Sequence, residues 1–395
     1  VRHCSERATT RGMRRSPVLL ALLALLGCIA PAARAEKPQE DWQLWSNMYM
    51  RCLYNCGFDG CSRLGYKNVT YMVGECVDGC VDRGPKDGSH PPEFDFGMRL
   101  TGWTCQTDCQ YRCMHTLQAI RKGEGLQPAK YYGKWSFTRV YGIQEFVSVV
   151  ASLANMAVHL RFIPMVFRAV WNRKAGANTG AMDVVSRGDA FAATWLVNSV
   201  VNANAWWWSA VFHARDTKWT TFMDYTSANV LMFSALYSVL VRTLELDAKR
   251  AVVLLAAFAA WAVTHVRMVN DPPDRRVESY RWALNMNVMI GIAVTHWAIV
   301  LPWAYGCRLR KGGFGSESRT VLSHPGRHSL ALFAVLWHLA ALAEVFDFPP
   351  LLGYLDSHAL WHCGTPHCVW LWYRFLREDL RWDGVRAVAR TKKEQ

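Results

Sequence analysis

The sequence predicts an all-α membrane protein with seven transmembrane helices behind an N-terminal, luminal, disulfide-rich domain. Three observations lead to this fold class: a signal-peptide pattern at the start, a cysteine-rich segment after it, and seven apolar runs in the remainder. A hydrophobic content of 51% with 19 tryptophans is also unusual for a soluble protein of 395 residues. The bilayer is therefore the expected environment for most of the chain.

Residues 1–35 are predicted to be a leader and a signal peptide. Two arginines follow Met13, the expected start, and Pro17–Ala30 is an apolar core too short to span a bilayer comfortably. Ala33-Arg34-Ala35 is typical of a cleavage site, so the mature chain is expected to begin at Glu36. The alternative interpretation is an uncleaved signal anchor.

Residues 36–132 are predicted to form the luminal cysteine-rich domain, because they contain no long apolar run and eight of the 13 cysteines. These are Cys52, Cys56, Cys61, Cys76, Cys80, Cys105, Cys109 and Cys113. An even set behind a signal peptide indicates disulfide bonds, and the glycosylation sequon at Asn68 fits the same compartment. A metal module is the alternative, although zinc modules favour Cys-x2-Cys pairs with histidine partners.

Residues 133–378 are predicted to be the transmembrane domain. Its apolar runs are Val140–Phe167, Ala190–Phe212, Tyr225–Val241, Ala251–His265, Ala283–Tyr305, His328–Val345 and Ala359–Phe375. Several of these runs are near the lower length limit for a membrane-spanning helix, and the fourth is the weakest. Residues 379–395 are predicted to be a cytosolic basic tail.

The distribution of lysine and arginine predicts the orientation in the membrane. Counted on alternate sides of the seven spans, one side with the tail collects 20 basic residues and the other only six. The positive-inside rule therefore places the tail in the cytosol, and scattered charge of this kind argues against nucleic acid as a partner. Lys392-Lys393 resembles a dilysine retrieval signal, which predicts an endoplasmic reticulum or Golgi membrane; the alternative is a basic solvated terminus.

Ionisable side chains inside spans are costly and mark functional sites by default. Ser209 and His213 lie four residues apart at the end of the second span, Asp224 opens the third, and His358 and His362 begin the seventh. Side chains four residues apart share a helix face. The seven-span topology puts all five residues on the luminal side, where they can converge.

This residue set predicts a catalytic zinc site. Three imidazoles from His213, His358 and His362 leave a fourth position for water, and zinc can lower the pKa of that water to about 7. Asp224 is expected to act as general base and Ser209 to help hold the oxyanion formed at an ester carbonyl. The alternative for each residue alone is chance spacing, since the chain has 13 histidines.

Other polar residues receive structural interpretations or stay open. Asp216 and Arg215 are expected to form an ion pair or a turn cap, and His265 and His296 to be satisfied core or interface residues. Glu145 and Asn155 are polar groups at membrane depth in the first span. They either hydrogen-bond between helices or support the site, and their spacing does not decide between these roles.

Several longer motifs carry a resemblance to a known family. They are Gly102-Trp103-Thr104-Cys105, Asp108-Cys109, Gly133-Lys134-Trp135, Gln144-Glu145, Asn204 to Thr217, Met223-Asp224-Tyr225, and Phe346-Asp347-Phe348-Pro349-Pro350 through His362. Through these motifs, from about Cys52 to Phe375, the chain resembles the post-GPI-attachment-to-proteins factor 3 family, the GPI-specific phospholipase A2-like group. That family is similar in turn to alkaline ceramidases and adiponectin-type receptors.

The resemblance implies a function as well as a fold. It implies a hydrolase with zinc that removes the sn-2 acyl chain from the lipid of GPI-anchored proteins in the luminal leaflet. It also implies a serine, an aspartate and three histidines around the metal, which fall on the five residues already selected. The alternatives are a ceramidase-like amidase of the same superfamily and a non-catalytic seven-span receptor or chaperone with structural zinc.

Overall fold

The computed structural model describes residues 47–50, 52, 94–131, 133–176, 182–270, 278–306 and 324–394. The predicted signal peptide, the sequon at Asn68, and Cys56, Cys61, Cys76 and Cys80 lie outside the described residues.

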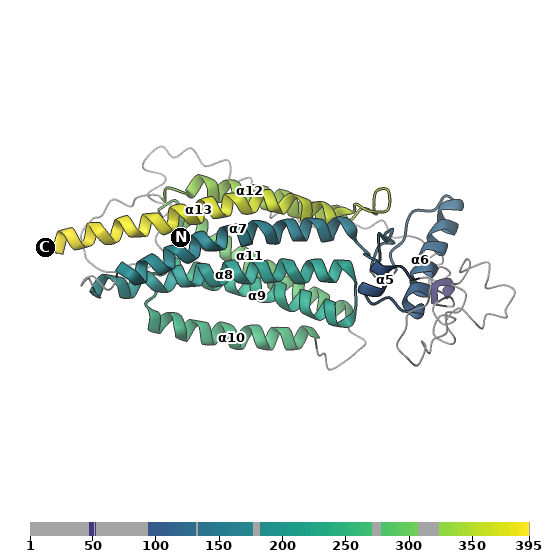
Figure 1. Cartoon of the computed structure of the whole chain (residues 1–395), viewed down its shortest axis with the longest axis horizontal. Coiled ribbons are helices and arrows are strands. Elements are labelled where there is room, and N and C mark those ends of the chain that lie inside the picture. The colour runs from purple at the N-terminus through teal and green to yellow at the C-terminus, as the bar shows by residue number, and fades with distance from the viewer. Residues whose placement is uncertain are drawn as a thin grey trace.

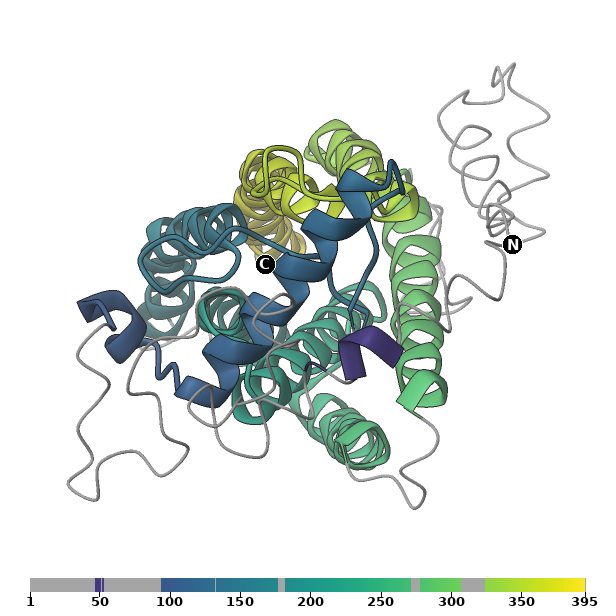
Figure 2. The same ribbon diagram turned by 90° about the vertical axis from the view of Figure 1, so that its right-hand side faces the viewer.

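Within these ranges the chain forms seven helices of 20 residues or more, which lie side by side as a bundle (Figure 1). They are α7 (Phe146–Gly176), α8 (Met182–Ala214), α9 (Lys218–Thr243), α10 (Ala248–Asn270), α11 (Glu278–Ala304), α12 (Arg327–Phe346) and α13 (Ser357–Glu394). Two shorter helices, α5 (Phe96–Leu100) and α6 (Cys105–Gly123), precede the bundle. Figure 2 shows that α6 crosses one end of the bundle, which we call the α6 end.

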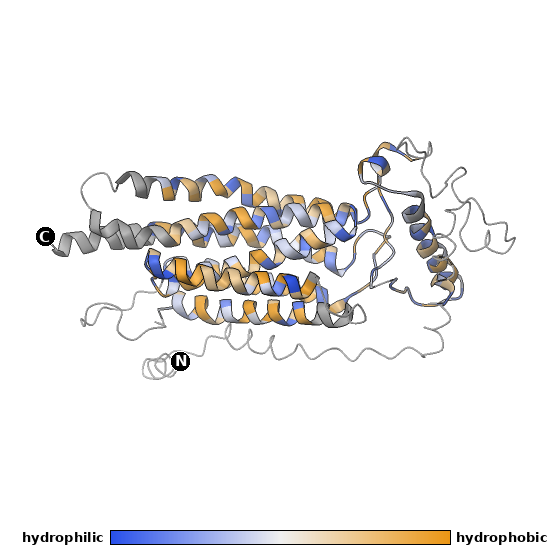
Figure 3. Ribbon diagram, turned by 90° about the horizontal axis from the view of Figure 1, so that it is seen from below, coloured by the Kyte–Doolittle hydropathy of each residue, from blue (hydrophilic) through white to orange (hydrophobic). Residues whose placement is uncertain are grey.

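Four helices of the described part, α7, α10, α11 and α12, are long and apolar enough to cross a membrane. Figure 3 shows that hydrophobic residues dominate much of the bundle. These four helices indicate that the chain is a multi-pass membrane protein. For α8, α9 and α13 the membrane-spanning assignment stays a prediction.

Each predicted apolar run falls on one helix, but two boundaries differ from the prediction. The first helix begins at Phe146 rather than Val140, because Val140 pairs with Ile143 in a tight turn. Tyr141 and Gly142 adopt φ angles of 48° and 78° there, in the left-handed region that an α-helix excludes. At the other end of the chain, α13 continues to Glu394, so the expected basic tail is helical over its described residues.

The residues before α7 are fastened to the α6 end of the bundle. A disulfide joins Cys52 to Cys113, and Cys109 is also disulfide-bonded. Lys130 forms an ion pair of 2.6 Å with Asp347 after α12. The ion pair holds the described residues 94–131 over one end of the helices, while the wider disulfide framework stays a prediction.

A buried charged network ties four elements together at the opposite end of the bundle. The Asp379 carboxylate accepts hydrogen bonds from Arg242 Nε at 2.9 and 3.0 Å and from Trp195 Nε1 at 3.1 Å, and His324 Nε2 lies 3.2 Å away. Asp379 and His324 are fully buried and Arg242 is nearly so. This network connects α8, α9 and α13 with the residues before α12.

Changing Asp379 to Asn is expected to destabilise the protein by about 3–5 kcal/mol, because it leaves the buried Arg242 guanidinium without a countercharge. Unfolding of the purified protein in detergent would measure the loss. Asp247→Asn is the matched control, since Asp247 pairs with Arg250 at an exposed site where such pairs contribute about 0–1 kcal/mol. Equal effects of the two substitutions would show that the network does not stabilise the fold.

Candidate metal centre

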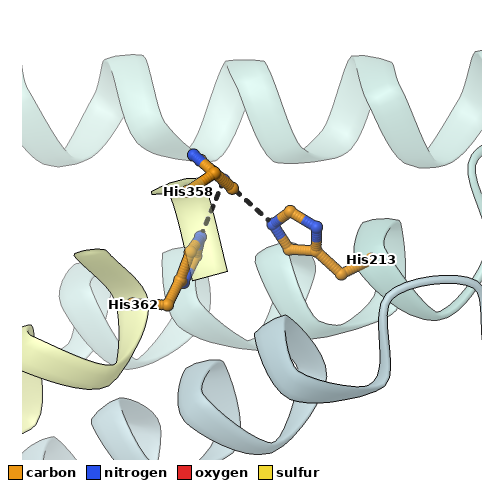
Figure 4. A group of neighbouring side chains, drawn as sticks. All are labelled: His213, His358 and His362. Carbon is orange, nitrogen blue, oxygen red and sulfur yellow. Dashed lines mark hydrogen bonds between the residues drawn. The ribbon is translucent and has the colours of Figure 1, made fainter. Parts of the chain in front are cut away.

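The three predicted histidines meet at the α6 end of the bundle. His358 Nε2 lies 2.9 Å from His362 Nε2 and 3.4 Å from His213 Nε2. One potential ligand atom from each ring lies within 4.8 Å of the other two. Figure 4 shows the three rings turned toward one another, with His213 coming from a different helix than the other two.

Local structure explains why His213 points into this group. α8 ends at Ala214 and α9 begins at Lys218, where the Thr217 side chain caps the new helix by accepting a hydrogen bond from Thr220 N. The backbone N–H of Glu145 donates to the carbonyl of His213 at 3.0 Å. This bond satisfies one of the carbonyls that have no hydrogen-bond partner within the last turn of a helix. The end of α8 is thereby held against the start of α7.

The start of α13 positions the other two histidines. Asp356 Oδ1 accepts a hydrogen bond of 2.7 Å from Ala359 N, so Asp356 caps the N-terminus of α13, two residues before His358. His362 follows one turn later on the same helix face. The i,i+4 spacing read from the sequence therefore corresponds to a helical pair in the structure.

Each histidine also has a partner on its other ring nitrogen. His213 Nδ1 lies 2.7 Å from Glu145 Oε2, His358 Nδ1 2.6 Å from Glu344 Oε1, and His362 Nδ1 3.1 Å from Ser152 Oγ. Metal-binding histidines generally hold their second nitrogen in this way, which fixes the ring orientation and leaves Nε2 free to bind the metal.

The donor set fits a metal ion with tetrahedral preference. Nitrogen ligands about 2.0–2.1 Å from a tetrahedral zinc lie roughly 3.3 Å from one another, close to the two separations that His358 Nε2 makes with the other histidines. His213 and His362 are buried and His358 is partly open, with 37% of its side chain exposed. Three histidines with one accessible side could therefore hold a metal and leave a position for another ligand.

Ser209 and Asp224 lie at the same end of the bundle as the histidines. Ser209 is buried, and its Oγ lies 3.1 Å from Ser152 Oγ, which in turn contacts His362. The half-buried Asp224 carboxylate lies near enough to His213 and His358 to interact electrostatically with both. All five residues selected from the sequence are therefore gathered at one end of the bundle.

The two residues whose roles were left open both contact the histidine group. Glu145 bonds His213 Nδ1, as described above. Asn155 Nδ2 donates to the carbonyl of His362 at 3.2 Å and to Thr365 Oγ1 at 3.0 Å, so it joins α7 to α13. Glu145 thus supports the site directly. Asn155 forms hydrogen bonds that join α7 to α13 next to the histidines.

Two other residues have structural contacts, although the ion pair of Asp216 is made with Lys134 rather than with Arg215. Asp216 forms an ion pair with Lys134 and accepts a hydrogen bond from Thr221 Oγ1 at 2.8 Å. His265 Nε2 lies 3.1 Å from Asn285 Oδ1 and is buried. Neither residue belongs to the histidine group.

Two supporting residues were not selected from the sequence. Glu344 is the lone carboxylate within α12, and an ionisable group in such an apolar helix was a signal that could have identified it. Ser152 offered no comparable signal, since helical serines commonly bond their own backbone.

Comparisons with known proteins agree with this arrangement. A model described as the Per1-like family matches residues 95–380. A Danio rerio protein named GPI-specific phospholipase A2-like PGAP3 is 34% identical over 324 residues, which cover 80% of this chain and 90% of that protein. The Homo sapiens protein of the same name is 30% identical over 315 residues, with 77% and 86% covered.

A Drosophila melanogaster protein named Post-GPI attachment to proteins factor 3 is 29% identical over 360 residues, which cover 90% of this chain and 92% of that protein. The matched region includes the helix bundle and all three histidines. The resemblance seen in the sequence motifs is thus confirmed, and the chain belongs to the Per1-like family.

Proposed function

We propose that this chain is a hydrolase that remodels the lipid of GPI-anchored proteins, removing the sn-2 acyl chain as a phospholipase A2 does. The observation that carries the proposal is the convergence of three histidine Nε2 atoms, each oriented by a bond at Nδ1, with Ser209 and Asp224 at the same end of the bundle. The names of the relatives supply the substrate class. Their similarity over most of the chain supports carrying that class over.

His213, His358 and His362 would hold zinc as the cofactor. When bound, zinc supplies Lewis-acid chemistry, lowering the pKa of a coordinated water to about 7 and polarising a carbonyl oxygen. Glu145, Glu344 and Ser152 keep the three imidazoles in the orientation that this ligand set requires.

The remaining residues carry out the proton transfer and the charge stabilisation. Asp224 takes a proton from the attacking water while the water oxygen bonds to the ester carbonyl carbon. Asp224 then returns that proton to the glycerol oxygen as the ester bond breaks. Ser209 donates a hydrogen bond to the oxyanion formed between these steps. The products are a free fatty acid and a lyso-lipid anchor, so the reaction consumes one water and needs no further reactant.

Two alternatives predict different outcomes. A ceramidase-like amidase could use the same five residues, but the cysteine-rich domain before the bundle favours the GPI-specific group. A receptor or chaperone would keep a structural zinc and show no turnover. The lipid that changes in cells without the protein separates the three possibilities.

We place the protein in the endoplasmic reticulum or Golgi membrane, with the α6 end in the lumen and the C-terminus in the cytosol. The 20 to six asymmetry of basic residues supports this orientation. A C-terminal tag should bind antibody after selective permeabilisation of the plasma membrane. Protection of that tag would reverse the orientation and place the histidine group in the cytosol.

In cells lacking this protein, GPI-anchored proteins should retain the unsaturated sn-2 chain, as measured by mass spectrometry of their lipids. The wild-type protein should restore remodelling, and Ser209→Ala should restore it poorly, because loss of an oxyanion donor costs about 100- to 1000-fold in rate. Ser238→Ala is the matched control, since Ser238 is buried in α9 and bonds the carbonyl of Thr194, away from the histidines.

Two results of the same experiment would reject the proposal. Unchanged anchors with accumulated ceramide would identify the amidase. If neither lipid changes and a metal-free variant still supports growth and trafficking, the protein does not act as a hydrolase.

A further inference from the structure

An exposed apolar cluster lies just before the helix bundle, outside the histidine group. Phe96 is 79% exposed, Leu100 74% and Tyr141 80%. Phe96 and Leu100 are four residues apart on α5 and therefore share a helix face, and Tyr141 lies in the turn before α7. We call these three residues the α5 patch.

The backbone holds the α5 patch in a fixed arrangement. Gly97 packs so closely against the turn that a Cβ atom there would lie 1.9 Å from the carbonyl oxygen of Tyr141, and one on Gly142 would lie 2.5 Å from Gly97. Trp103 Nε1 also donates to the carbonyl of Gly142 at 2.7 Å. This contact requires glycine at both positions. α5 and the turn therefore form one rigid unit that displays the three apolar side chains.

The α5 patch lies close in the chain to an exposed apolar face of a candidate membrane span. α7 contains a candidate membrane span that begins at Phe146, only five residues after Tyr141. On the outer face of this helix, Phe146, Val150 and Leu153 are 39%, 51% and 37% exposed. Figure 2 shows the short helix α5 beyond the edge of the bundle, on the side of α7.

The position along the bilayer normal also fits lipid. The headgroup regions add roughly 5–8 Å to each side of the hydrocarbon core. A turn that immediately precedes a membrane span lies in this layer, where aromatic side chains are enriched because they combine an apolar ring with a polar group. Tyr141 and Phe96 are such aromatic residues, and large exposed apolar groups rarely gather on a protein surface without a partner.

We propose that the α5 patch inserts into the interfacial layer of the leaflet at the α6 end, with phospholipid as its partner. The insertion anchors the cysteine-rich domain to the membrane beside α7. Through the α5 unit it also fixes the turn that leads to Glu145 and α7. This inference concerns lipid contact alone and does not depend on the proposed hydrolase activity.

Site-specific photocrosslinking of the full chain in phosphatidylcholine nanodiscs tests the inference. Phe96→benzoylphenylalanine and Leu100→benzoylphenylalanine should each give lipid adducts on irradiation, detected by mass spectrometry. Val150 on the exposed face of α7 provides the positive control, and Glu124, exposed at the C-terminal end of α6, the negative control. These positions are exposed, so the substitution leaves the packing unchanged.

Lipid adducts at positions 96 and 100 but not at 124 are the expected result. Adducts at position 150 alone would show that the α5 patch stands clear of the membrane. Adducts from position 96 to a second copy of the chain would show that the patch is a protein interface instead. Either of these two results overturns the inference, and neither bears on hydrolysis of a GPI anchor.

Discussion

Replacing His362 with alanine is expected to abolish both metal binding and hydrolysis. The His362 ring is 2% exposed, and its Nε2 lies 2.9 Å from His358 Nε2, so no other side chain or solvent readily substitutes for it. A site with three protein ligands cannot lose one and keep the open tetrahedral geometry. Zinc content per mole of purified protein and fatty-acid release from a GPI substrate measure the two losses, and His358→Ala should behave in the same way.

His338→Ala provides the matched control for these substitutions. His338 lies within α12 and bonds the carbonyl of Ala334 in its own helix, so its loss removes an imidazole without touching the metal ligands. This variant should keep about one zinc and most of the activity. Full activity in a variant that lacks both His213 and His362 would rule out the site.

The sequence alone predicted the three histidines and Ser209 because these residues form two pairs that are local in the sequence. Ser209 with His213 and His358 with His362 are each four residues apart, and helical spacing alone puts each pair on one face. The order of the spans then decided that these pairs lie at the same end. The structure agrees, since the three rings meet at the end that α6 crosses.

The supporting contacts depend on packing between distant segments and could not be predicted in the same way. Ser152 and His362 are 210 residues apart, and Glu145 and His213 are 68 apart. No periodic pattern relates such residues; they meet because α7 packs against both α8 and α13. The Asp379 network was missed for the same reason, since its partners come from separate elements.

The start of the first helix shows a different limit of the sequence pattern. Hydrophobicity extends the apolar run back to Val140, but hydrophobicity does not report backbone conformation. Gly142 was the available signal for a break, because glycine adopts the positive φ that the turn requires. The turn matters because it sets where Glu145 meets His213.

Changing Asp224 to Asn is expected to reduce hydrolysis by about 100- to 10,000-fold, the range over which general bases contribute, while zinc content stays near that of the wild type. Asparagine preserves the shape of the side chain but cannot accept the proton of the attacking water. Asp224 is absent from the group of potential ligand atoms, which contains the three histidines. Metal binding and catalysis should therefore separate in this variant, whereas they are lost together in His362→Ala.

Asp247→Asn is the control for Asp224→Asn, because Asp247 lies between α9 and α10, away from the histidines, and pairs with Arg250 at an exposed site. Removing that ion pair should lower activity far less, since Asp247 has no place in the proton transfer. The pH profile gives a second readout: the low-pH limb of wild-type activity should change shape in Asp224→Asn, because the remaining fall then comes only from the histidine ligands and the bound water. If Asp224→Asn loses its zinc, or keeps wild-type activity with an unchanged profile, Asp224 is not the general base.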